Sequence, residues 1–172
     1  MINLIDTPGH VDFTVEGVRS LRVLDGVIGL FCAVGGVEPQ SETVWRQAEK
    51  YSVPRLAFVN KMERPGADFY SVVEQIQEEL GANAVPVTIP IGAEENFAGI
   101  IDLVNDVAVY YDETDQGMTW REEPIPAAMQ AEARKWKQHL LEKVSEVNDR
   151  LLEKFMNDQP IGDRELSAAI RE

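Results

Sequence analysis

Residues 6–10 combine side chains suited to chemistry on a phosphate group. They read Asp6-Thr7-Pro8-Gly9-His10 and follow the mainly apolar residues 2–5. A carboxylate in this place can hold Mg²⁺, usually through water, and the bare N–H of a glycine can approach a terminal phosphate. A polar side chain directly after that glycine is placed to orient an attacking water. Because Asp, Pro and Gly are also common where a strand ends in a turn, residues 6–10 taken alone leave a plain turn as an equal alternative.

A second polar stretch, Asn60-Lys61-Met62-Glu63, follows the apolar residues 56–59. In GTP-binding proteins the corresponding Asn-Lys-x-Asp reads guanine: the acid accepts hydrogen bonds from N1–H and the exocyclic amine, and the lysine packs along the ring. Glu63 is one methylene longer than aspartate, and a misplaced acceptor costs ~1–3 kcal/mol when it leaves buried donors poorly paired. Alone, the stretch also suits a polar turn. Together, two such stretches at the ends of neighbouring strands indicate a nucleotide-binding site far more specifically than either does alone.

The first half of the chain alternates predicted strands with predicted helices. Strands are expected at residues 2–6, 26–34 and 55–59, and helices at residues 13–24, 39–51 and 67–80. Residues 26–34 and 56–59 are continuous apolar runs, typical of strands buried on both faces of a parallel sheet, and Cys32 is therefore predicted to be an inert core residue. Ligands bind at the carboxyl ends of such strands, where Asp6 and Asn60 fall.

The second half predicts a different architecture. Short strands are expected at residues 84–91, 99–104, 107–111 and 118–122, separated by turns. Pro86 and Pro90 favour an edge position or a bulge for the first of them. An amphipathic stripe then predicts a long helix over residues 129–155 with a break at 145–148, and Asp163 is expected to cap a last short helix. We therefore predict two units, an α/β unit of residues 1–80 and an α+β unit of residues 81–172.

The composition favours a globular chain without a membrane span or a broad nucleic-acid surface. With 30 acidic and 16 basic residues among 172, the formal charge is −14, and residues 91–172 hold 18 of the acids against 9 bases. A negative charge of this size argues against a broad surface that binds nucleic acid electrostatically. The longest run without a charged residue, residues 80–93, has fourteen residues, short of the ~18–20 that cross a bilayer. The single cysteine, Cys32, favours a reducing compartment such as the cytoplasm.

Longer runs of the sequence resemble the elongation factor G family, the bacterial translocation GTPases. The runs are residues 6–13, 20–26, 33–41 and 58–62 in the first half, and residues 80–82, 90–94 and 99–103 in the second, where that family carries its G′ insertion. The resemblance implies an α/β fold: an incomplete P-loop GTPase-type parallel sheet with helices, plus a small α+β G′ subdomain. It also implies GTP or GDP and Mg²⁺ as cofactors of the complete protein, with none bound to this chain alone.

The resemblance assigns roles to both polar stretches. Asp6 would hold Mg²⁺ through water, Gly9 would sense the γ-phosphate in switch II, and His10 would be the catalytic residue that positions the hydrolytic water. The remaining nucleotide-binding residues would be Thr7, Pro8, Asn60, Lys61, Met62 and Glu63. The implied partner is the ribosome, with the sarcin–ricin loop of its RNA near switch II and its large-subunit stalk protein at G′. Neither a membrane nor DNA is an expected partner.

The sequence contains no Gly-x-x-x-x-Gly-Lys-Ser/Thr, the loop that cradles nucleotide phosphates. The family places that loop and switch I upstream of Asp6. We therefore expect an internal piece of the factor that does not hydrolyse GTP, with part of its sheet face exposed. Ser167-Ala168 lies in a predicted polar helix and is not assigned to guanine binding. The alternatives left open are a non-catalytic module that binds the ribosomal stalk, a variant paralogue, and another translational GTPase such as release factor 3.

Overall fold

The computed structural model describes residues 2–5, 24–115 and 117–171. The chain divides into two compact units, Met1–Ala84 and Val85–Glu172. Each unit is built around its own sheet, a two-stranded one in the first and a four-stranded one in the second. The predicted α/β class, a parallel sheet with helices, is confirmed.

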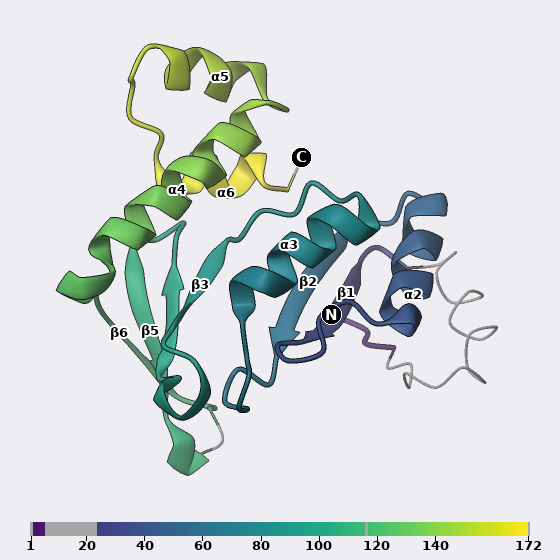
Figure 1. Cartoon of the computed structure of the whole chain (residues 1–172). Coiled ribbons are helices and arrows are strands. Elements are labelled where there is room, and N and C mark those ends of the chain that lie inside the picture. Colours follow the sequence, from purple (N-terminus) through teal and green to yellow (C-terminus); the bar gives the residue numbers. More distant parts are fainter. Residues whose placement is uncertain (1, 6–23, 116, 172) are drawn as a thin grey trace. The chain divides into compact units, whose positions relative to one another are not determined.

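The first unit alternates strands and helices, as Figure 1 shows. The elements are β1 (Val27–Cys32), α2 (Pro39–Lys50), β2 (Arg55–Asn60) and α3 (Phe69–Leu80). The two strands are parallel and in register from Val27↔Arg55 to Cys32↔Asn60. Both predicted helices of this region are therefore confirmed, and the carboxyl ends of the two strands lie side by side.

The core of this unit lies on one face of the sheet. It is formed by Phe31, Trp45, Val72, Ile76 and Leu80, which come from β1, α2 and α3. The rings of Phe31 and Trp45 meet edge to face, with centroids 5.7 Å apart, a favourable geometry for aromatic pairs. Burial of these side chains holds both helices on the strands.

The opposite face of the same sheet is exposed. Ile28 and Leu30 on β1 are 59% and 64% exposed, and their register partners Leu56 and Phe58 on β2 are 52% and 53% exposed. The expectation that both strands are buried on both faces is thus wrong, whereas the expected exposure of part of the sheet face is confirmed. The physical reason is that α2 and α3 both pack on the face that carries Phe31.

The first residues of the chain do not form the predicted strand. Residues 2–5 have no regular secondary structure, and the side chains of Ile2, Leu4 and Ile5 are exposed. A short, mainly apolar segment forms a strand only where a neighbouring strand satisfies its backbone groups. The helix predicted over 13–24 falls outside the described residues, except for Leu24, which is not helical.

The two helices of the first unit begin and end at residues that favour those ends. Pro39 opens α2, and the backbone N–H of Glu38 donates to Ser41 Oγ at 2.9 Å. Asp68 caps α3 by accepting a hydrogen bond from the Ser71 N–H at 3.0 Å. Gly81 ends α3 in the left-handed conformation, with φ of 62°, which glycine adopts without steric cost.

The second unit begins with a four-stranded antiparallel sheet. Its strands are β3 (Thr88–Ile91), β4 (Gly99–Asp102), β5 (Val107–Tyr111) and β6 (Trp120–Pro124), paired in that order. Short 3₁₀ turns occupy Glu94–Asn96, Glu113–Asp115 and Ala127–Met129. The edge position predicted for the first strand from Pro90 is confirmed, because β3 pairs only with β4 among the described strands.

Three helices complete the second unit: α4 (Gln130–Ser145), α5 (Asp149–Met156) and α6 (Asp163–Ala169). The predicted break in the long helix is confirmed, and Asn148 caps α5 by accepting from the Leu151 N–H at 3.0 Å. The predicted cap of α6 is wrong: Gly162 is the N-cap, and Asp163 is the first helical residue. No helix in the described part of the chain combines the length and apolar character needed to cross a membrane.

Candidate functional site

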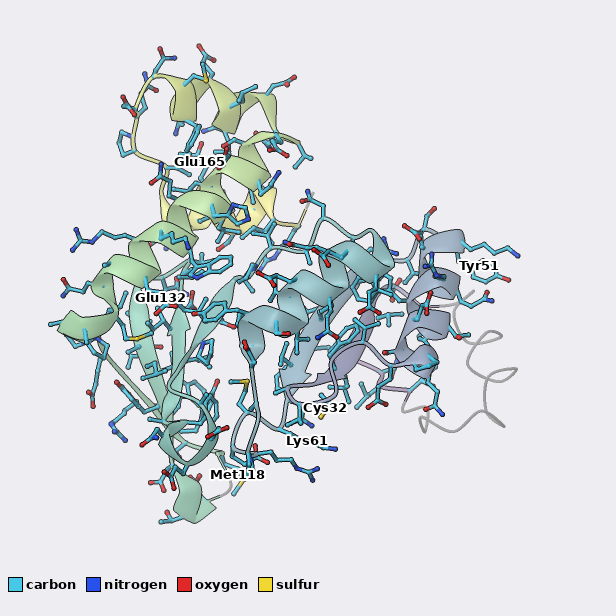
Figure 2. All side chains as sticks on the ribbon, viewed as in Figure 1. Cys32, Tyr51, Lys61, Met118, Glu132 and Glu165 are labelled. Carbon is cyan, nitrogen blue, oxygen red and sulfur yellow. The ribbon has the colours of Figure 1, made fainter. Side chains whose placement is uncertain are left out.

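The carboxyl end of the β1–β2 pair carries the part of the predicted site that the structure describes. Cys32 ends β1 directly opposite Asn60, which ends β2. Figure 2 shows Cys32 and Lys61 at this same end of the two strands. Because parallel strands present their carboxyl ends at one edge, ligand-binding side chains collect there.

Asn60 shapes the turn that follows β2. Its side-chain Oδ1 accepts a hydrogen bond from the backbone N–H of Lys61 at 2.9 Å. Lys61 has a φ of 68°, in the left-handed region that non-glycine residues seldom occupy. Such a conformation costs of order 1–3 kcal/mol and persists where the surrounding structure enforces it, which occurs mostly at binding sites and turns.

The residues after Lys61 form a short turn that we call the Asn60 loop, residues 60–67. The backbone N–H of Arg64 donates to Lys61 O at 3.2 Å, and that of Ala67 donates to Arg64 O at 3.1 Å. Met62 and Ala67 are 6% and 8% exposed and anchor the loop in the core. Glu63 lies between these anchors and is exposed, so its carboxylate is accessible to a ligand at this edge.

Ala33, on the turn after β1, joins the two ends of the Asn60 loop. Its backbone N–H donates to Asn60 O at 2.8 Å, and its backbone O accepts from the Asp68 N–H at 2.9 Å. Ala33 itself is buried. Sequence reasoning missed this residue, because alanine carries no functional group. No signal in the sequence set it apart, since the predicted strand of residues 26–34 includes it, whereas β1 ends at Cys32.

Cys32 is half-buried and is not the core residue that the sequence predicts. Hydrogen bonds from the backbone N–H groups of Gly35 and Val34 lower the pKa of the Cys32 thiol, and the charges of Lys61 and Arg64 lower it further, against the opposing effect of partial burial. The sequence shows no base close to Cys32, because both cations reach it from the neighbouring strand's end.

The first predicted stretch cannot be placed beside the second. Asp6, Thr7, Pro8, Gly9 and His10 all lie outside the described residues. Their roles in Mg²⁺ binding and catalysis therefore stay predictions. Within residues 2–5, 24–115 and 117–171, no three His, Cys, Asp or Glu side chains come together as metal ligands.

The side chains of the Asn60 loop suit the recognition of a planar base. Lys61 is half-buried and carries a cation on a long apolar stem, and the exposed carboxylate of Glu63 accepts hydrogen bonds. A purine ring with two adjacent N–H donors matches this set, with the stem against its face and the acid at its edge. The residues present thus fit a guanine ring better than an adenine ring, whose corresponding edge lacks the paired donors.

Two comparisons with known proteins bear on the family and the fold of this chain. Residues 1–161 match the family described as the elongation factor Tu GTP binding domain. The structure is similar to the crystal structure of a protein from Thermus thermophilus, with a TM-score of 0.82 and 27% sequence identity. That similarity covers 95% of this chain and 24% of the other. This chain therefore spans about a quarter of the length of the protein that it resembles.

Proposed function

This chain belongs to the family of the elongation factor Tu GTP-binding domain, and from that premise we propose that it is part of elongation factor G. That factor is the GTPase that moves tRNA and mRNA through the ribosome in the cytoplasm. The observation that carries the proposal is the sequence Asn60-Lys61-Met62-Glu63 at the carboxyl end of β2, in a chain whose residues 1–161 match a GTP-binding family. Residues 1–80 would then belong to the GTPase domain and residues 81–172 to its G′ insertion.

In this proposal the Asn60 loop binds the guanine of GTP or GDP. The carboxylate of Glu63 accepts hydrogen bonds from N1–H and from the exocyclic amine, while the stem of Lys61 covers one face of the ring. The hydrogen bond between Asn60 Oδ1 and the Lys61 N–H keeps the lysine backbone in its left-handed conformation, so that the loop is formed before the base arrives. Such preorganisation lowers the cost of binding.

The phosphate end of the nucleotide is assigned to residues 6–10. Asp6 would hold Mg²⁺, Gly9 would sense the terminal phosphate with Thr7 and Pro8 beside it in the nucleotide site, and His10 would orient the attacking water on the ribosome. Mg²⁺ supplies neutralisation of the charge on the transferring phosphate. Because the 172 residues contain no Gly-x-x-x-x-Gly-Lys-Ser/Thr, we propose that this chain alone does not hydrolyse GTP.

The test compares this chain with a longer product in which a phosphate loop is placed ahead of Met1. We expect ribosome-stimulated hydrolysis of GTP, but not of ATP, by the longer product. His10→Ala should abolish that stimulation and leave the affinity for a fluorescent GDP analogue unchanged. The 172-residue chain should show neither low-micromolar GDP affinity nor Mg²⁺-dependent turnover. Turnover by the short chain, or no response of the longer product to ribosomes, would overturn the proposal.

The acidic second half is proposed to face a protein partner on the ribosome. Residues 91–172 hold 18 acids and 9 bases, a balance that repels RNA and favours a basic or neutral protein surface. The stalk protein of the large subunit is the proposed partner, while the sarcin–ricin loop of the RNA would approach residues 6–10 in the first unit. Titration of the chain with the C-terminal domain of the stalk protein checks this. The absence of binding at high micromolar concentration would remove the stalk from the proposal.

A further inference from the structure

Gln75, in the middle of α3, reaches across the first unit to the turn after β1. Its Oε1 accepts a hydrogen bond from the backbone N–H of Val37 at 3.0 Å, and its Nε2 donates one to Ser71 Oγ at 3.2 Å. Both contacts are partly buried, and an amide in such surroundings is costly to leave unpaired. Both the oxygen and the nitrogen of the Gln75 amide are thus hydrogen-bonded, which fixes the position of the side chain.

Gly36 provides the space for this amide. Its φ is +66°, and a Cβ added there would overlap the Oε1 and Cδ atoms of Gln75. The turn is closed by a hydrogen bond from the Gly36 N–H to Cys32 O at 2.8 Å. Since both the backbone conformation and the available space require glycine, Gly36 and Gln75 form a matched pair.

The contacts of Gln75 belong to a closed ring of hydrogen bonds and short chain segments, to which Asn60 is attached through Ala33. On α3, Gln75 binds Ser71, and the Ser71 N–H donates to the Asp68 side chain. The Asp68 N–H donates to Ala33 O, and the Ala33 N–H donates to Asn60 O. Val37, four residues after Ala33, closes the ring by donating back to Gln75. Loss of one member therefore loosens the support of the others.

We propose that Gln75 is a positioning residue for the Asn60 loop and, through that loop, a determinant of selectivity for the base. This inference rests on the proposed function of the loop. Gln75 does not contact the nucleotide: it acts through the turn of residues 33–37 and the start of α3, which hold the loop from both ends. Its removal frees Ala33 and Asp68 to move, so Glu63 no longer meets the base at a fixed distance.

Hydrogen exchange on the 172-residue chain without nucleotide tests the positioning role. In Gln75→Leu, the backbone amides of Ala33, Arg64, Ala67 and Asp68 should exchange about tenfold faster, as expected when one supporting hydrogen bond is lost. Gln75→Glu keeps an acceptor for the Val37 N–H and should restore most of the protection. Gly36→Ala, which expels the same amide from the other side, should reproduce the effect of Gln75→Leu.

Gln77→Leu is the matched control. Gln77 lies on the same helix, is also half-buried, and donates from Nε2 to Ala84 O at 2.7 Å, away from the Asn60 loop. The control should leave those four amides unchanged. If it accelerates them equally, or if Gln75→Leu accelerates only the Val37 amide, the proposal is wrong. Should Gln75→Leu unfold the chain, Gln75→Asn, which shortens the reach by one methylene, gives the same comparison in a folded protein.

Selectivity for guanine is measured in the longer product as the ratio of its affinities for GDP and IDP. Inosine lacks the exocyclic amine that Glu63 is proposed to bind, so the ratio reports how well the carboxylate is placed. Gln75→Leu should reduce the GDP/IDP ratio by about tenfold, and Gln77→Leu should not change it. A wild-type protein that does not distinguish the two nucleotides would refute the proposed function of the loop, while the exchange result would still decide the positioning role. An unchanged ratio in Gln75→Leu would refute the selectivity role alone.

Discussion

At the scale of single residues, the carboxyl end of β1 holds a thiol with unusual surroundings. Cys32 is the only cysteine of the chain, and its sulfur faces the backbone N–H groups of Gly35 and Val34 as well as two cationic side chains. N–H donors and positive charge stabilise the thiolate more than the thiol. The pKa of Cys32 is lowered for this reason, and the thiolate is the reactive form.

We predict that Cys32 reacts with iodoacetamide at a lower pH when the protein is folded than when it is unfolded. The pH midpoint of the alkylation rate should lie below that of the same chain in urea, where an ordinary cysteine titrates near ~8.5. Lys61→Gln should raise the folded midpoint by removing a nearby cation, and Lys50→Gln should not. Mass spectrometry of the alkylated fraction measures both. A folded midpoint at or above the unfolded one would contradict the prediction.

At the scale of elements, the end of α3 tests how much one backbone conformation contributes to stability. Gly81 has a φ of 62°, and a Cβ added there would meet nothing within 4 Å. A substitution at this position therefore changes the backbone energy without creating a clash. At Gly36 and Gly92 a positive φ and a steric overlap occur together, so Gly81 isolates the conformational effect.

We predict that Gly81→Ala lowers the free energy of unfolding by about 1 kcal/mol, because L-residues are disfavoured in the left-handed region. Urea denaturation followed by circular dichroism measures the change. Gly26→Ala is the matched control, since Gly26 has no positive φ and a Cβ there would make only an ordinary contact of 3.7 Å with Pro54 O. Equal effects of the two substitutions would mean that the helix end does not depend on glycine.

The positions of the helices could be predicted from the sequence, but the burial of the strands could not. Apolar spacing and capping residues are local, so α2, α3 and the break before Asp149 follow from them. The apolar run of β1 shows only that this strand suits burial. Which face is covered depends on where α2 and α3 pack, and Ile28 and Leu30 are exposed as a result.

The residues of the candidate site could also be predicted only in part from the sequence. Asn60 and Glu63 could be identified because their side chains carry the chemistry and stand at the end of an apolar run. The support from Ala33 and Gln75 could not, because it arises between residues far apart in the sequence: Val37 and Gln75 are 38 positions apart. Every residue except proline can donate a hydrogen bond from its backbone N–H, so contacts of this kind cannot be predicted from residue type. Only the glycine at position 36 indicates that a close approach occurs there.

At the scale of the whole molecule, net charge and one apolar surface act in opposite directions on solubility. The formal charge is −14 at pH 7, so copies of the chain repel each other. The exposed face of β1 and β2 places four large apolar side chains next to one another: Ile28, Leu30, Leu56 and Phe58. A contiguous apolar surface of this kind favours association once repulsion is removed.

We therefore predict a solubility minimum near the sequence pI of 4.5, relieved by the double substitution Leu30→Thr with Phe58→Thr. Threonine keeps the β-propensity of both strands while making the face polar. The pair Val147→Thr with Met156→Thr, which changes two other exposed apolar residues, should give little relief. Light scattering across pH 4 to 8, with circular dichroism to confirm folding, measures the difference. At pH 7 all three proteins should remain monomeric, because charge repulsion outweighs the apolar attraction; equal relief by the control pair at the pI would show that total apolar exposure, not this face, drives the association.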